Sequence, residues 1–287
     1  MSKLKRPDFL IIGVQKSATT WLQKMLMLHP DIYMPNQEVH YFDNNKNFLK
    51  GHNWYSSFFK DAKSTQLIGE KTPDYIWTNC SNFPQYSHEK HIRIKEFNPN
   101  IKLISVFRNP VDRFISAFHH HKRRGRIPSD LQVKSLFNEP IYSKILLSML
   151  DRGLYGLQLE TFYNEFYKDQ MKILLHDDVK NNPTETLSDV FSFLGVSNVD
   201  LSDYESKRHN VYRATRLGST LARKSNKYFN KFILRLDKYF LNKLPIEKVK
   251  YPQLSFDEKQ LLINYYKKDV LKFESLIEKD LPDYWKN

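Results

Sequence analysis

A scarcity of cysteine and glycine excludes several classes of small or extended protein. Cys80 is the single cysteine, so an internal disulfide and a zinc site built from several cysteines are both excluded. Only 8 of the 287 residues are glycine and 13 are proline, which does not fit a fibrous or low-complexity chain. We therefore expect an ordinary globular protein that is stabilised by an apolar core.

Long apolar runs are scarce as well. The first run starts at Phe9 and ends after about five residues, whereas a secretory signal needs roughly 7–15 apolar residues and a membrane span about 20. No later run reaches that length. We therefore expect a soluble, cytoplasmic protein.

Hydrophobic and aromatic residues, by contrast, are plentiful. They make up 40% and 14% of the chain, enough for a substantial core in one large α/β domain or two small ones. The formal net charge of +13 favours an anionic partner, but it fits a solvated, lysine-rich surface equally well. Charge alone does not decide between these two interpretations.

Apolar runs rich in β-branched residues alternate with segments of helical periodicity. Buried strands are predicted at 9–13, 66–69, 101–107 and 171–176. Helices are predicted from Thr19 or Thr20, from Pro110, and over 141–152, 157–167, 186–196 and 256–277. The alternation predicts a P-loop-like, three-layer α/β/α fold with a central parallel sheet. We interpret residues 1–287 as a single domain, whose basic part 217–287 is helical and packs on the core.

The segment after the first predicted strand has the outline of a phosphate-binding loop, with the sequence GVQKSATT from Gly13 to Thr20. It departs from the ATP-binding pattern G-x-x-x-x-G-K-[ST], because no glycine directly precedes the lysine. Backbone N–H groups around Lys16 to Thr20 are still expected to converge on a phosphate at the positive end of the helix dipole. Lys16 supplies a point charge and the hydroxyls supply donors. The loop therefore fits a phosphate that needs no metal.

A second anion site is predicted where the 101–107 strand ends. Arg108 follows this strand, and Ser116 lies eight residues further on in the next helix. An arginine fork beside a hydroxyl is a good receptor for a terminal phosphomonoester. A ligand that is held at the ends of the 9–13 and 101–107 strands should carry two separated phosphate groups. A nucleotide with a 5′-linked group and a 3′-phosphate has this shape.

Three segments in this order resemble sulfotransferases that use 3′-phosphoadenosine 5′-phosphosulfate (PAPS): GVQKSATTWL, LISVFRNPVDRFISAF and LLHDDVKNNPTETLSDVFSFLGV. The segments PNQEVHYFD, NWYSSFF and GEKTPDYIW are most similar to the heparan sulfate glucosaminyl 3-O- and N-sulfotransferase branch. The resemblance spans roughly Phe9 to Val196. It implies in-line transfer of the sulfuryl group to a hydroxyl, or less readily an amine, with release of adenosine 3′,5′-bisphosphate and without a metal.

The resemblance also assigns roles to individual residues. It implies nucleotide contacts for Lys16, Ser17, Ala18, Thr19, Thr20, Arg108 and Ser116. It implies that Glu38 is the general base, that Lys16 compensates charge on the leaving phosphate, and that Lys71 steadies the sulfuryl oxygens. The acceptor end is implied to consist of Glu38, His40, Asp43 and Lys71, with His40 and Lys71 also counted as catalytic.

The chain departs from these relatives in two ways. They close a nucleotide-covering loop with a disulfide, which a single cysteine cannot form. In its place stands SKRHNVYRATRLGS, whose basic residues offer a replacement lid: Lys207, Arg208, Arg213 and Arg216. Tyr212 is predicted near the adenine, and Arg213 is counted with it among the nucleotide contacts, while the choice between the four basic residues stays open. The missing membrane anchor favours a cytoplasmic enzyme, whose acceptor is a carbohydrate, glycolipid or polysaccharide and need not be heparan sulfate.

Two other functions stay open at this point. Asp177 and Asp178 follow the 171–176 strand and suit a magnesium-dependent kinase or NTPase. The net charge of +13 and the lysine-rich, aromatic stretch 217–250 suit a non-enzymatic module that binds a polyanion or a membrane. The same stretch also suits a helix that packs on the domain, with or without peripheral membrane contact. Nucleic acid is not an expected partner. The run His119–His121 is not predicted to bind a metal, because neighbouring residues on a helix point in different directions.

Overall fold

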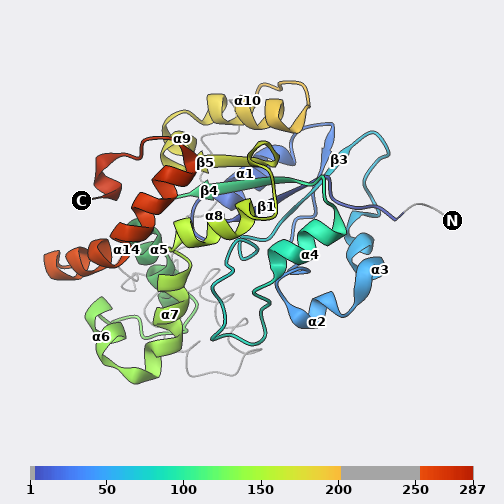
Figure 1. Cartoon of the computed structure of the whole chain (residues 1–287). Helices are drawn as coiled ribbons and strands as arrows, with labels where there is room; N and C mark the ends of the chain where they lie inside the picture. Colours follow the sequence, from blue (N-terminus) through green and yellow to red (C-terminus); the bar gives the residue numbers. More distant parts are fainter. Residues whose placement is uncertain (1–3, 202–252, 287) are drawn as a thin grey trace, which may run out of the picture. The chain divides into compact units, whose positions relative to one another are not determined.

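The computed structural model describes residues 4–201 and 253–286, which form two compact units (Figure 1). The first contains residues 4–109, 154–201 and 266–286, and the second contains residues 110–153 and 253–265. Each unit is described by itself. The interpretation as a single domain stays a prediction.

Part of the predicted site lies outside the described residues. This applies to Tyr212 and Arg213, to Lys207, Arg208 and Arg216, and to the stretch 217–250. The lid and the helix expected within 217–250 therefore stay predictions.

The first unit is built on a sheet of five strands, all paired in parallel. The strands are β1 (Phe9–Gly13), β2 (Ile32–Tyr33), β3 (Leu67–Lys71), β4 (Lys102–Phe107) and β5 (Met171–Leu175). Their spatial order is β2-β3-β1-β4-β5, so β1 is central. Because both faces of a parallel sheet are buried, its central strands are nearly continuous apolar runs, and all five residues of β1 are buried.

Helices of the first unit are α1 (Thr19–Leu26), α2 (Asn45–Phe48), α3 (Gly51–Ser56), α4 (Lys90–Phe97), α8 (Tyr155–Tyr163), α9 (His176–Asn181) and α10 (Pro183–Leu194). The second unit has α5 (Pro110–Arg123), α6 (Val133–Asn138) and α7 (Ser143–Asp151). Helix α14 (Phe256–Ile277) contributes to both units. Short 3₁₀ turns occur at Ser57–Phe59, Pro140–Tyr142, Lys168–Gln170 and Asp283–Trp285.

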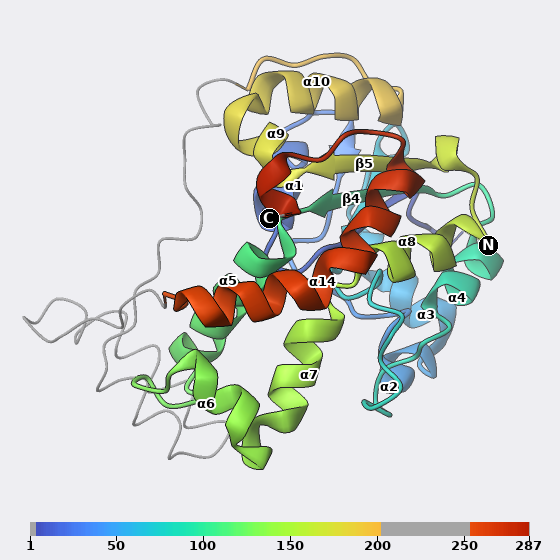
Figure 2. The ribbon, with the colours of Figure 1, turned by 60° about the vertical axis from the view of Figure 1, so that its left-hand side comes forward.

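Successive residues of β4 pack against different layers. Val106 belongs to a hydrophobic cluster with residues of α1 and α10, among them Val190. Phe107 faces the other side, where its ring centroid is 5.0 Å from that of Tyr155 in α8 and 4.5 Å from that of Phe273 in α14. Figure 2 shows α10 on one side of β4 and β5, and α8 on the other. The predicted α/β/α arrangement around a parallel sheet is therefore confirmed.

The predicted strands agree with the observed ones except at their ends. The 9–13 strand and the start of α1 at Thr19 are as expected. Strand β3 runs on to Lys71, two residues beyond its predicted end, and so brings Glu70 into the sheet. His176, expected in a strand, begins α9 instead. The two-residue strand β2 and the short helices α2–α4 were not predicted, because they are too short to show a period.

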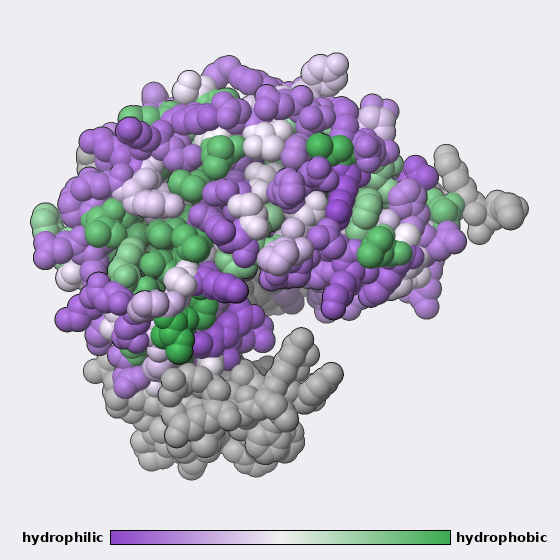
Figure 3. Space-filling view, turned by 60° about the horizontal axis from the view of Figure 1, so that its bottom comes forward, coloured by the Kyte–Doolittle hydropathy of each residue, from purple (hydrophilic) through white to green (hydrophobic). Residues whose placement is uncertain are grey.

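Within the described part of the chain, no helix has the length and apolar character that crossing a membrane requires. Hydrophilic residues cover most of the face drawn in Figure 3, with hydrophobic residues in smaller groups between them.

Candidate active site

The predicted phosphate loop and Arg108 leave the sheet at the same edge. All five strands are parallel, so their carboxyl ends share one edge. The loop follows β1, and Arg108 follows the neighbouring strand β4. The chain passes from β1 to β2 and β3 on one side and to β4 and β5 on the other, so the strand order reverses here. Open α/β sheets bind their ligands at such a point.

The phosphate loop is held to β4 and has an unusual backbone. Val14 N donates to Val106 O at 3.0 Å. Lys16 and Ala18 both have left-handed conformations, with φ of 75° and 69°. Turns of this kind expose successive N–H groups on a concave side, which suits an anion. The loop thus has the backbone of an anion-binding nest without the glycines that usually permit it.

Ser17 gives a direct indication that this loop holds a ligand. Its side chain is completely buried, and its Oγ has no hydrogen-bond partner among the described atoms. A buried hydroxyl without a partner costs about 1–3 kcal/mol, so such atoms usually mark a ligand or water site. Helix α1 begins two residues later without a side-chain cap from any described residue. A phosphate group fits this arrangement.

Gly13 connects this loop to the turn after β3. A Cβ at this position would lie 2.3 Å from Ile76 Cγ2 and 3.4 Å from Pro73 O. The same turn is fixed to β1 by Ile76 N, which donates to Ile12 O at 2.9 Å. Glycine is required here because the turn packs on the start of the phosphate loop. The two segments are therefore mechanically linked.

Arg108 is half-buried, and its backbone carbonyl accepts a hydrogen bond from Tyr155 OH at 2.8 Å. This bond fixes the exit of the chain from β4. Ser116, its predicted partner at a 3′-phosphate, lies on α5 in the second unit. Their joint role stays a prediction.

The four residues predicted at the acceptor end lie together. Lys71 Nζ is 2.6 Å from Glu38 Oε1. His40 bridges two carboxylates, with Nε2 3.5 Å from Glu38 Oε2 and Nδ1 2.8 Å from Asp43 Oδ2. Lys71 is 4% exposed at the end of β3, whereas the Glu38 side chain is 41% exposed. The accessible carboxylate of Glu38 is therefore oriented by the buried ammonium of Lys71 and by the imidazole of His40.

The charges of this cluster shift its pKa values in a consistent way. Burial raises the pKa of Glu38, but hydrogen bonds from His40 and Lys71 outweigh it and hold that pKa below the ordinary value. Burial lowers the pKa of His40, but the carboxylates of Asp43 and Glu38, with the charge of Asp74, raise it to about 10. Glu38 is therefore ionised and His40 is an imidazolium at neutral pH.

Asp74 joins the cluster from the turn after β3 and was not predicted. Potential metal-binding atoms of His40, Asp43 and Asp74 lie within 4.8 Å of one another, the one such group of three or more in the described residues. In the described geometry the His40 imidazole pairs with Asp43 and Glu38, and these carboxylates raise its pKa to about 10.

The acids that favoured a magnesium-dependent kinase are engaged elsewhere. Asp177 accepts hydrogen bonds from Tyr284 OH and, at 3.3 Å, from Trp285 Nε1. Asp178 pairs with Lys279 at 2.9 Å. Both lie in α9 after β5, which is separated from β1 by β4. They connect the C-terminal segment to the sheet and do not border the phosphate loop.

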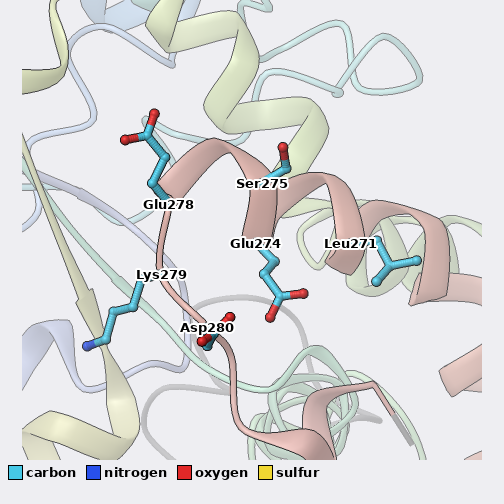
Figure 4. Close-up of a pocket in the computed structure, with 6 residues that line it drawn as sticks. All are labelled: Leu271, Glu274, Ser275, Glu278, Lys279 and Asp280. Atoms are coloured by element: carbon cyan, nitrogen blue, oxygen red, sulfur yellow. The ribbon is translucent and has the colours of Figure 1, made fainter.

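A pocket of about 370 Å³ lies at the carboxyl end of α14 (Figure 4). It is lined by Leu271, Glu274, Ser275, Glu278, Lys279 and Asp280. Glu274 is paired with Lys286 at 2.6 Å, and Glu278 with Lys168. An acidic lining of this kind does not suit a phosphate or sulfate.

Comparison with known proteins gives a family match over most of the chain. Residues 6–244 match the family model described as "Sulfotransferase domain". Mouse heparan sulfate glucosamine 3-O-sulfotransferase 3B1 is 30% identical over 194 residues, which cover 67% of this chain and 47% of the relative. Bifunctional heparan sulfate N-deacetylase/N-sulfotransferase 1 of Xenopus laevis is 27% identical over 95% of this chain and 30% of the relative. The chain thus spans about half or less of these relatives.

Solved structures give a matching fold. A sulfotransferase from Alicyclobacillus acidocaldarius superposes with a TM-score of 0.69 at 22% identity, covering 99% of this chain and 100% of the other. Mouse sulfotransferase SULT7A1, solved in complex with PAP, superposes with a TM-score of 0.51 at 12% identity, over 96% of this chain and 91% of the other. These likenesses confirm the P-loop-like fold.

Proposed function

The chain belongs to the sulfotransferase family, and from this premise we propose that it transfers the sulfuryl group of PAPS to a hydroxyl of a carbohydrate acceptor. One observation carries the proposal. A phosphate loop with a buried, unpartnered serine hydroxyl leaves β1 beside Arg108 at the end of β4, and β3 on the other side of β1 presents the Lys71–Glu38 pair. A nucleotide site and a base thus occupy neighbouring strand ends.

The residues present fit the donor nucleotide. In this proposal the 5′ side is held by Lys16, Ser17, Ala18, Thr19 and Thr20 through N–H groups, hydroxyls and one ammonium. Arg108 and Ser116 bind the 3′-phosphate, and Tyr212 and Arg213 cover the nucleotide. The solved complex of SULT7A1 with PAP, on a similar fold, supports a bisphosphate nucleotide.

The reaction is an in-line displacement at sulfur. The acceptor oxygen forms a bond to sulfur as the bond from sulfur to the 5′-phosphate oxygen breaks, the acceptor proton passes to Glu38, and adenosine 3′,5′-bisphosphate leaves. Lys16 compensates the charge that develops on the leaving phosphate. No metal takes part.

Glu38 is a weak base in its observed surroundings. Its ion pairs with Lys71 and His40 hold its pKa low, so it accepts a proton only once the bond to sulfur has largely formed. When Lys71 turns from Glu38 to the sulfuryl oxygens, the carboxylate becomes more basic and the transferred group gains a positive partner. That exchange accelerates the reaction only if the new contact is stronger in the transition state than in the ground state. His40 meanwhile orients Glu38.

The acceptor is proposed to be a glycan hydroxyl, on a polysaccharide or a glycolipid. The curated relatives named above act, by their names, on heparan sulfate. A hydroxyl is proposed ahead of an amine, and 3-O-sulfotransferases and N-sulfotransferases both occur among the relatives at 30% identity.

Two measurements test this function. Adenosine 3′,5′-bisphosphate is expected to raise the melting temperature at millimolar concentration, and no stabilisation would contradict the nucleotide site. Radiolabelled PAPS with a panel of glycans is expected to give a labelled product. Tighter binding of ATP–Mg²⁺ than of the bisphosphate nucleotide would favour the kinase alternative instead.

A further inference from the structure

The loop that carries Glu38 and His40 is fixed in an unusual way, by side chains rather than by a β ladder. Three consecutive N–H groups each donate to a side chain at or after the end of β3: Val39 N to Glu70 Oε1 at 3.4 Å, His40 N to Thr72 Oγ1 at 3.2 Å, and Tyr41 N to Tyr75 OH at 3.0 Å. The carbonyls of Val39 and His40 accept from Asn47 Nδ2 at 3.2 and 3.1 Å. Five backbone groups of three residues are thus held by side chains.

This fixation determines where the site residues point. His40 has a left-handed conformation, with φ of 54°, which a residue other than glycine keeps only when its surroundings enforce it. Val39 and Tyr41 are buried, at 4% and 1% exposure, while Glu38 and His40 remain partly exposed. The loop therefore presents the base and its imidazolium on the accessible side.

Glu70 lies at the base of this arrangement. It is completely buried, Oε1 accepts from Thr72 Oγ1 at 2.6 Å, and Oε2 accepts from Tyr55 OH at 3.4 Å. Since Thr72 Oγ1 accepts the His40 N–H, its single hydrogen is available for Glu70. These partners of Glu70 are donors, which is the arrangement that an ionised carboxylate requires.

We propose that Glu70 is a positioning residue for the sulfuryl transfer proposed above, and the proposal rests on that function. Its carboxylate fixes the backbone of residues 39–41 directly through Val39 N and indirectly through Thr72, and so sets the orientation of Glu38 and His40. The next residue of β3, Lys71, reaches Glu38 through its side chain. Strand β3 thus fixes Glu38 in two ways. Glu70 holds the backbone of the residues that follow Glu38, and Lys71 pairs with the Glu38 side chain.

Burying the Glu70 carboxylate costs free energy, because a charge is removed from water. Burial raises the pKa of Glu70 to about 7, although hydrogen bonds from Thr72 and Tyr75 lower it. A neutral glutamine has nearly the same shape and avoids the cost of burying a charge. Its NH₂ group, however, would replace an acceptor that faces hydroxyl and amide donors. Glutamine therefore tests whether the two acceptor oxygens of Glu70 are needed to fix the loop.

The test is Glu70→Gln, with Tyr55→Phe as the control that keeps the carboxylate and removes a hydroxyl that contacts both Glu70 and Tyr75. Turnover is measured with PAPS and the best acceptor of the glycan panel, and amide hydrogen exchange is measured for residues 38–41. We expect kcat to fall about 10- to 100-fold in Glu70→Gln, because a displacement of about 1 Å at a reacting group costs up to about 100-fold. The amides of Val39 and His40 are expected to exchange about tenfold faster.

The shift in melting temperature caused by adenosine 3′,5′-bisphosphate and the KM for PAPS are expected to stay close to those of the unmodified protein. Unchanged kcat and unchanged exchange in Glu70→Gln would overturn the positioning role. A fall in kcat that merely follows a loss of folded protein and nucleotide binding would also overturn it. No transfer by the unmodified protein would contradict the proposed function itself, a result that is distinct from both.

Discussion

Two loops at the carboxyl edge of the sheet are built in opposite ways. Residues 13–20, after β1, present left-handed residues and a buried serine hydroxyl, so the backbone itself forms the expected phosphate site. Residues 38–43 carry the base, and side chains of β3, of the turn after it and of α2 take up the backbone groups of Val39, His40 and Tyr41. In the proposed function the donor loop binds mainly through backbone N–H groups and the charge of Lys16, whereas the acceptor loop acts through charged side chains that its neighbours orient.

The largest expected effect separates the two loops by function. Glu38→Gln removes the base and keeps the shape, so turnover should fall about 100-fold or more while binding of adenosine 3′,5′-bisphosphate is unchanged. Steady-state kinetics and a thermal shift measure the two quantities. Glu160→Gln is the matched control, since Glu160 is similarly exposed and paired with Lys272 outside the site. Equal loss of nucleotide binding would mean that Glu38 supports both loops.

The two lysines provide the next comparison. Lys16→Ala should weaken binding of the bisphosphate nucleotide about tenfold or more, because the loop loses its charge. Lys71→Ala should leave that binding intact and lower kcat about 10- to 100-fold, because Glu38 loses its buried partner at 2.6 Å. Titration calorimetry and kinetics distinguish the two, with Lys172→Ala, an ion pair on β5, as the control. The same pattern of losses in both variants would contradict the division of roles.

A structural variant tests whether the loops are mechanically linked. Gly13→Ala should lower the free energy of unfolding by about 1–3 kcal/mol, since its Cβ would lie 2.3 Å from Ile76 Cγ2. Denaturant unfolding measures this loss. The double variant Gly13→Ala/Ile76→Ala should lose less free energy of unfolding than the two single variants lose together, because the clash is then relieved. Simple additivity would show that the turn after β3 and the phosphate loop are independent.

The smallest expected effect is a pH dependence of stability. The pKa of Glu70 is raised in the folded state from about 4.5 to about 7, so the folded protein binds an additional proton between these values. Stability from this group is therefore fully present below pH 4.5 and is lost as the pH rises to about 7. Relative to Glu70→Gln, the unmodified protein should melt at progressively lower temperature across this window. A constant difference in melting temperature would contradict a buried, titrating Glu70.

Sequence motifs were sufficient to predict which residues lie at the carboxyl edge of the sheet. Lys16 follows a buried strand among small hydroxyl residues, Arg108 follows another, and the parallel pairing of β1 with β4 puts both at one edge. The motif with Glu38 and His40, and the one with Lys71, likewise contained the residues that the structure brings together. Short-range spacing and strand ends contain this information, because parallel strands share their carboxyl edge.

The residues that support the site could not be predicted in this way. Glu70 and Asp74 act on a loop about thirty residues away in the chain, through contacts that exist only once β3 and the loop have packed together. The left-handed conformations of Lys16, Ala18 and His40 are equally hidden, because sequence indicates such conformations mainly at glycine. The predicted end of β3 at residue 69 also placed Glu70 outside the sheet, where burial was not expected.

The central claim is that the loop after β1 and Arg108 after β4 hold opposite ends of one nucleotide. Its most direct test is a titration of adenosine 3′,5′-bisphosphate and of adenosine 5′-monophosphate into the unmodified protein and into Arg108→Ala. The unmodified protein should prefer the bisphosphate, and Arg108→Ala should lose that preference while its affinity for the monophosphate is unchanged. Equal losses for both nucleotides, or no loss for either, would contradict the claim.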